Sequence, residues 1–114
     1  MSKFLYLFRT QGEGFKPASP EEMERMMKAW MDWIDGLRQA GHLVQTGERL
    51  QPSGKVLRGK AKAVTDGPYA ESKDLVGGYL LVEARDLDEA AELAKGCPIF
   101  GIDGLVEVRP VVSM

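Results

Sequence analysis

Four side chains capable of acid, base or hydrogen-bonding chemistry lie close together near the middle of this chain. Asp66, Tyr69, Glu71 and Lys73 fall within eight residues, between two apolar runs. The link that contains them, residues 64–77, is far longer than the two to five residues of a plain hairpin loop. A long polar link of such varied composition is typical of a functional loop, so these four residues are the first candidates for a site.

Each of these residues has a chemical and a structural interpretation. Asp66 could act as a general base or orient a substrate, and an Asp before Gly-Pro also commonly caps a turn. Tyr69 could line a pocket and donate from its hydroxyl, or anchor the loop onto the sheet through its ring. Glu71 and Lys73 could bind a polar ligand, or form a solvent-exposed ion pair that contributes little stability.

Other chemistry is less well supported by the sequence. His42 is the only histidine, and no acidic or cysteine partner near it in the sequence would orient it as a catalytic base. Cys97 precedes a proline at a predicted helix end, where the helix dipole disfavours a thiolate, so we expect it to be buried and inert. No spacing of His, Cys, Asp and Glu predicts a metal site, and we expect no cofactor.

Composition limits the class of protein. The 114 residues fit one domain, residues 1–114, with 44% hydrophobic and 28% charged side chains. Fifteen Lys and Arg stand against seventeen Asp and Glu, and this near balance, with a net charge of −2, argues against a nucleic-acid partner. No run of like charges indicates a polybasic patch that would bind a membrane surface. A single cysteine excludes an internal disulfide, and the apolar run at residues 4–8 is too short for a signal peptide or a membrane span. We therefore predict a cytoplasmic protein.

Two helices and five strands are expected around the loop. Ser19 is a good N-cap with Pro20 after it, and apolar residues then recur at helical spacing until Gly41. Asp86 caps a second helix, which Gly96 ends. Apolar or alternating runs predict strands at residues 3–9, 42–50, 55–64, 78–84 and 105–112, and the charged third run is expected at a sheet edge.

This order contains the split βαβ pattern of a ferredoxin-like α+β fold, with an antiparallel sheet and two helices. Two helices cover one face of such a sheet, yet the strands are apolar on both faces. Phe4 and Tyr6 point to one face, and Leu5 and Leu7 point to the other. A second subunit is the simplest cover for the remaining face, so we predict a homodimer packed sheet to sheet.

Three further residues are candidates for a ligand site. Trp30 lies in the apolar stripe of the first helix, which is either core or the wall of an apolar pocket. Glu107 and Arg109 share one face of the last strand, where a charged pair is unusual. The pair either bridges the dimer interface or faces a cleft that takes a polar ligand.

Several motifs together resemble the DGPF group of YCII-related proteins, over nearly the whole chain. The matching runs are Thr65-Asp66-Gly67-Pro68-Tyr69-Ala70-Glu71-Ser72-Lys73, Gly77-Gly78-Tyr79, Leu87-Asp88-Glu89-Ala90, Cys97-Pro98 and Val106-Glu107-Val108-Arg109-Pro110. The resemblance implies a dimeric α/β-barrel variant of the ferredoxin-like fold. The one mild departure is Tyr69, where the motif usually has Phe.

The resemblance implies little about activity. Other YCII-like proteins carry a His on the first helix and an Asp before the proline that follows the second helix, a pair proposed to act in catalysis. The matching positions here hold Trp30 and Cys97, so this chemistry does not carry over. The DGPF group is also linked to sigma-factor regulation, which implies a regulatory interaction domain as the alternative function.

The leading hypothesis is a dimeric protein that binds a small, partly apolar molecule in a cleft between the sheet and the first helix. Trp30 and Tyr69 would shape the pocket, and Lys73 and Arg109 would make polar contacts. Any reaction would be a proton transfer or a lyase-type step with Asp66 as the base. Whether the chain is an enzyme stays open at this point.

Overall fold

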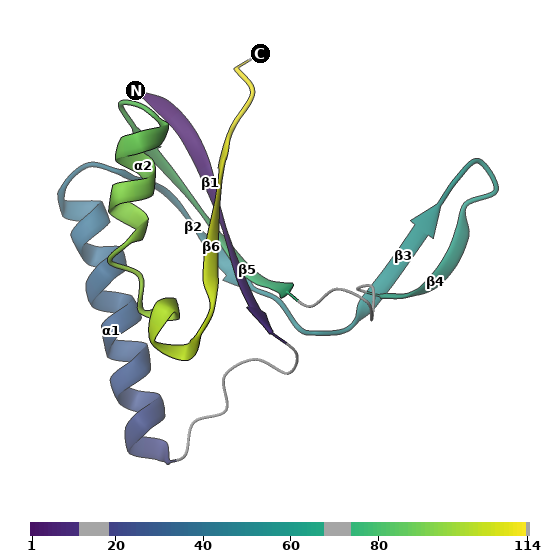
Figure 1. Ribbon diagram of the computed structural model, residues 1–114, viewed down its shortest axis with the longest axis horizontal. Coiled ribbons are helices and arrows are strands. Elements are labelled where there is room, and N and C mark those ends of the chain that lie inside the picture. The colour runs from purple at the N-terminus through teal and green to yellow at the C-terminus, as the bar shows by residue number, and fades with distance from the viewer. Residues whose placement is uncertain (12–18, 68–73, 114) are drawn as a thin grey trace.

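The computed structural model describes residues 1–11, 19–67 and 74–113 (Figure 1). The candidates Tyr69, Glu71 and Lys73 lie outside these ranges. In chain order the elements are β1 (Ser2–Gln11), α1 (Pro20–Gln39), β2 (Leu43–Arg49), β3 (Gly54–Arg58), β4 (Ala63–Gly67), β5 (Asp74–Ala84), α2 (Leu87–Ala94), the 3-10 helix η1 (Pro98–Ile102) and β6 (Leu105–Pro110).

The main sheet has four antiparallel-paired strands in the order β2-β5-β1-β6. Strand β5 lies between the two strands that α1 connects, and β1 lies between the two strands that α2 connects. Each βαβ unit is thus split by a strand of the other unit, which is the arrangement of a ferredoxin-like α+β fold. The predicted fold class is confirmed at this level.

The helix boundaries agree with the capping signals in the sequence. The Ser19 hydroxyl accepts from the Glu22 backbone N–H at 3.1 Å, and the Asp86 carboxylate accepts from the Glu89 N–H at 2.8 Å. Each bond satisfies a backbone donor that the first helical turn would leave unpaired. After α1, Gly41 adopts a φ of +82°, which glycine tolerates without strain.

The charged run at residues 55–64 is not one edge strand, as the sequence suggested, but the two strands of a hairpin. Gly59 and Lys62 both have positive φ, and the Lys62 N–H donates to the Gly59 carbonyl at 3.0 Å. This tight turn reverses the chain and pairs β3 with β4 from Gly54–Gly67 at the base to Arg58–Ala63 at the tip. Gly59 is the one residue of this run whose type favours a turn.

The predicted long link between residues 64 and 77 is correspondingly shorter. Asp66 and Gly67 belong to β4, and β5 begins at Asp74, several residues earlier than the apolar core of that strand suggested. The early part of β5 pairs with the end of β1, where Arg9 lies opposite Val76. A register shift between Phe8 and Arg9 accommodates one extra residue, so β5 bulges there.

Both helices pack on the same face of the main sheet (Figure 1). The buried residues on this side come from alternate positions of β1 and β5 and from the facing helices: Phe4, Tyr6, Phe8, Leu37, Leu80, Val82, Ala84, Ala90, Ala94, Cys97 and Ile99. Among the described elements, neither helix packs on the second face of the sheet, as predicted (Figure 1). No helix within the described ranges is long and apolar enough to span a membrane.

The β3–β4 hairpin projects from the rest of the fold, on the side of the sheet away from the helices (Figure 1). The chain measures 46 × 45 × 19 Å, with a radius of gyration of 15.7 Å. A compact domain of this length has a radius of gyration of about 13 Å. The excess arises because the hairpin makes no extensive contact with any other described element.

Candidate functional site

The space between the sheet and α1, where the sequence placed a cleft, is filled by aromatic rings. Trp30 packs edge-on against Phe8 with ring centroids 5.0 Å apart, and Trp33 stacks on Tyr6 at 6.0 Å. The two tryptophans also meet each other at 5.9 Å. Trp30 therefore lies in the packed aromatic layer that joins α1 to β1, which is the core interpretation of the apolar stripe.

Two hydrogen bonds tie this layer to α2. The Tyr6 hydroxyl donates to the Ala90 carbonyl at 2.5 Å, and the Trp33 indole N–H donates to the Leu93 carbonyl at 3.1 Å. Burial, with a smaller contribution from the neighbouring Cys97 sulfur, raises the pKa of the Tyr6 hydroxyl, so it stays a protonated donor. These bonds satisfy the polar atoms of the two rings, and they join α2 to β1 through Tyr6 and to α1 through Trp33.

Asp66 lies on the hairpin, away from this layer. Its side chain is 89% exposed, and the Lys55 ammonium donates to its carboxylate at 2.5 Å across the ladder. The carboxylate therefore makes a cross-strand ion pair instead of capping a turn. The Asp66 carboxylate is therefore in contact with water, whereas catalytic carboxylates are usually desolvated.

The uncovered face of the main sheet brings together the other candidates. Alternation along β1 and β5 places Leu5, Leu7, Tyr79 and Leu81 here, and all four are half-buried. They form the apolar centre of this face, which we call the open face. The register places the charged residues of β6 beside them, because Leu5 pairs with Arg109 and Leu7 pairs with Glu107.

A cluster of three charged side chains borders this apolar centre. One carboxylate oxygen of Glu107 accepts from the Arg9 Nε at 2.9 Å, and the other accepts from an Arg109 Nη at 3.2 Å. The hydrogen bonds from Arg9 and then Arg109 hold the pKa of Glu107 below its usual range. Glu107 is thus ionised near neutral pH, and the cluster carries two positive charges for one negative charge.

Arg9 is the member of this cluster that the sequence did not reveal. In the sequence, Arg9 is simply the residue that ends an apolar run. Its contact with Glu107 could not be predicted, because the two residues lie far apart in the chain. The signal lies in strand register, which places Arg9 opposite Leu105 on the neighbouring strand. The predicted ligand residues do not all meet: Arg109 lies on the open face, whereas Trp30 lies on the helix side of the sheet.

A glycine on β2 allows Tyr79 to lie close to the β2 backbone. A Cβ atom at Gly47 would lie 2.0 Å from the Tyr79 carbonyl oxygen and 2.5 Å from its ring. No side chain other than hydrogen fits there without moving β2 away from β5. Gly47 is therefore a second residue of the open face that sequence reasoning did not single out.

The remaining reactive groups are structural. Cys97 is 4% exposed, so the expectation of a buried cysteine is confirmed, and burial raises the pKa of its thiol to about 12. His42 is half-buried, and its Nδ1 donates to the Glu83 carbonyl at 2.8 Å. The Glu83 N–H donates back to the His42 carbonyl at 2.7 Å, so the residue extends the β2–β5 pairing.

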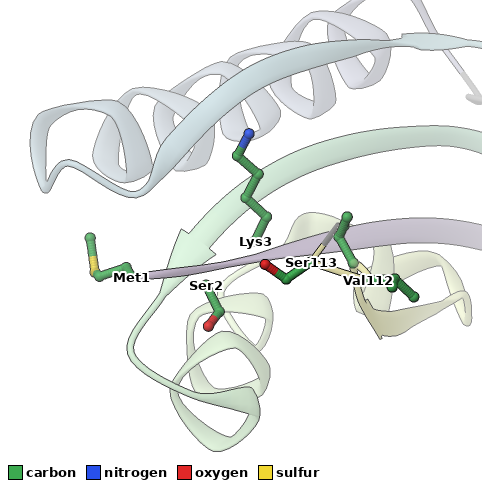
Figure 2. A pocket seen from close by; sticks show the side chains of 6 residues that line it. Met1, Ser2, Lys3, Val112 and Ser113 are labelled. Atoms are coloured by element: carbon green, nitrogen blue, oxygen red, sulfur yellow. The ribbon is translucent and has the colours of Figure 1, made fainter.

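A shallow hollow lies where the two ends of the described chain meet (Figure 2). Its lining comes from the start of β1 and the residues after β6: Met1, Ser2, Lys3, Val111, Val112 and Ser113. The Val111 N–H donates to the Lys3 carbonyl at 3.0 Å, which joins the two segments that line the hollow. None of the candidate site residues lines it.

The family of the chain follows from comparison with known proteins. The family model of the YCII-related domain matches residues 12–114, which is most of the sequence. This chain belongs to the YCII-related family. No curated protein matches it. The assignment agrees with the motifs quoted from the sequence, and it leaves the role of this YCII-related domain to be argued from the open face.

Proposed function

We propose that this YCII-related domain is a homodimer that binds a small organic anion with an apolar part on the open face of its sheet. The observation that carries the proposal is the Arg9–Glu107–Arg109 cluster at the border of the apolar, half-buried centre of the open face. Charged side chains are rarely retained on such a surface unless they are paired or used.

The chemistry of the cluster favours an anion. Glu107 is shared by two guanidinium groups, and among the described residues Arg109 has only this shared carboxylate as its acidic partner. The Arg109 side chain is 64% exposed and makes its contact with Glu107 through one Nη, so its planar fork offers further donors to a carboxylate. Leu5 and Leu7 lie next to it on β1 and would contact the apolar part of the ligand.

The dimer is part of this proposal because a ligand on a single sheet face would stay largely in water. Binding sites for small molecules usually enclose most of the ligand surface. Two open faces packed together would cover the apolar centres of both sheets and enclose the charged clusters between them. This arrangement is the dimeric α/β barrel that the family resemblance implies.

Binding should depend on Arg109 and on the charge of the ligand. We expect small aliphatic and aromatic carboxylates at millimolar concentration to raise the melting temperature by mass action, whereas the matching amides do not. Arg109→Gln should weaken the binding of the best carboxylate about tenfold or more, because a charge-assisted bidentate contact is lost.

A matched control removes a guanidinium elsewhere. Arg25 is exposed on α1, on the other side of the sheet, so Arg25→Gln should leave the carboxylate-induced shift unchanged. If each amide stabilises the protein as well as its carboxylate, or if both arginine variants behave alike, the proposed site is wrong.

Asp66 lies outside this proposed site, and its replacement tests whether the hairpin takes part in ligand binding. Asp66→Asn removes an exposed ion pair, so the free energy of unfolding should change by less than about 1 kcal/mol. The carboxylate-induced shift in melting temperature should match that of the wild type. A loss of ligand binding in this variant would return the functional site to the loop that the sequence first suggested.

A further inference from the structure

The projecting hairpin carries a charge opposite to that of the rest of the chain. Residues 54–67, which we call the basic arm, contain four cationic residues and one carboxylate, a net charge of +3. The whole chain has a net charge of −2, so the remainder, which we call the body, has a net charge of −5. The net charge of the whole sequence is close to zero, although the basic arm is positive and the body is negative.

The basic arm also exposes apolar side chains. Leu57 is 63% exposed and Val64 is 58% exposed, and the two residues are cross-strand partners. An isolated two-stranded hairpin is marginally stable in water, because it has no hydrophobic face to bury. The arm has an exposed apolar pair and makes no extensive contact with the other described elements, so packing on a second molecule would stabilise it.

The position of the arm indicates where that partner lies. The arm leaves the main sheet on the side away from the helices, which is the side of the open face (Figure 1). A molecule that covers the open face therefore lies beside the arm. In the dimer of the proposed function, that molecule is a second copy of this chain.

We propose that the basic arm of each protomer clasps the body of its partner, with Leu57 and Val64 packed on the partner and the lysines of the arm paired with carboxylates of the partner's body. This inference rests on the dimer of the proposed function and adds a second contact to it. Charge complementarity favours a second copy, because the arm at +3 meets a body at −5. The same negative body would repel a nucleic acid.

The first test separates the apolar and charged contacts by sedimentation velocity. Leu57→Ser with Val64→Ser should raise the dimer dissociation constant about tenfold or more, because buried apolar area is lost on association. Lys60→Glu with Lys62→Glu, at the tip of the arm, should also weaken the dimer and remove much of its salt dependence. Both variants should retain the wild-type circular dichroism, since the main sheet and core are untouched.

A matched control carries the same change of charge on the helices. Lys28→Glu with Lys95→Glu alters two exposed lysines on α1 and at the end of α2, away from the arm and the open face. We expect its dimer dissociation constant to stay within about twofold of the wild type. Equal weakening by both pairs of lysine variants would mean that net charge alone matters, and it would overturn the clasp.

The second test identifies the molecule that the arm contacts. Lys60→Cys labelled with a photo-crosslinker can be attached selectively, because Cys97 is 4% exposed. Labelled protein in ¹⁴N is mixed with unlabelled protein in ¹⁵N and allowed to exchange protomers, and the crosslinked peptides are identified by mass. We expect crosslinks between a ¹⁴N arm and ¹⁵N body peptides.

The outcomes distinguish this inference from the dimer on which it rests. A dimer whose arm crosslinks stay within one chain, and whose dissociation constant ignores the arm variants, overturns the clasp and leaves the sheet-to-sheet dimer standing. A monomer at tens of micromolar overturns both. Binding of a duplex DNA probe that Lys60→Glu with Lys62→Glu abolishes, without any effect on the dimer, would assign the arm to a different partner and also overturn the clasp.

Discussion

Replacing Trp33 by alanine should lower the free energy of unfolding by about 3 kcal/mol, the lower end of the usual cost of deleting a large core aromatic side chain, because the ring is partly buried against the core. The ring contacts Tyr6, Phe8 and Trp30, with centroids 5.9–6.0 Å away. The change also leaves the Leu93 carbonyl without the indole donor that bonds it. Urea denaturation followed by circular dichroism measures the effect directly.

Two controls separate the packing of the ring from its hydrogen bond. Trp33→Phe keeps an aromatic ring and loses the N–H donor, so much of the destabilisation should be absent and a loss of about 1–2 kcal/mol should remain. Met31 lies two positions earlier on the same helix and is 54% exposed, so Met31→Ala should be nearly neutral. A neutral effect of Trp33→Ala would mean that the space between sheet and helix is open, as the sequence first suggested.

Replacing Leu81 by lysine should raise the dimer dissociation constant at least about a hundredfold. Leu81 lies on the open face, paired with Leu5 on one side and Gln45 on the other. In the proposed dimer, two unpaired ammonium groups would be taken out of water at the same interface, and each costs several kcal/mol. Sedimentation equilibrium over a range of protein concentrations gives the dissociation constant.

The control for this prediction is a lysine on the helix side. Met31→Lys adds the same charge to an exposed position of α1, and the dimer dissociation constant should not change. The melting temperature of Leu81→Lys, measured at a concentration where the wild type dissociates, should stay close to that of the wild-type monomer. If Leu81→Lys and Met31→Lys dimerise equally well, the open face is not the interface.

The elements with strong local signals could be predicted from the sequence. Ser19 and Asp86 fix the starts of the two helices, because each side chain accepts a hydrogen bond from a backbone N–H of the first helical turn. Alternation along β1 separated the buried Phe4 and Tyr6 from Leu5 and Leu7 on the opposite face. Local signals of this kind are carried by a few neighbouring residues, so a single sequence suffices to detect them.

The hairpin and the site depended on information that a single sequence does not carry. The turn at Gly59 and Lys62 relies on two positive φ angles, and only the glycine announces one of them. The contact between Arg9 and Glu107 depends on the register of β1 against β6, which is set by the packing of the whole sheet. Asp66 looked catalytic because its neighbours in the sequence are polar, but its neighbour in space is Lys55.

This chain has neither the His nor the Asp at the two positions that are proposed to be catalytic in other YCII-like proteins. The positions that match the proposed catalytic dyad of other YCII-like proteins hold Trp30, packed on Phe8, and Cys97, which is buried. Both positions therefore serve the core of this protein. Because both side chains pack in the core, we propose ligand binding at the open face and no catalytic role for Trp30 or Cys97.

The most direct test of the open face as the functional surface is the mass of the wild-type protein in solution. Sedimentation equilibrium at micromolar concentration should give the mass of two chains, in place of the 12.6 kDa of one. A small carboxylate that raises the melting temperature should then shift this equilibrium further toward the dimer, because the ligand lies between the two sheets. A species of 12.6 kDa at tens of micromolar, with or without such a carboxylate, would contradict the account.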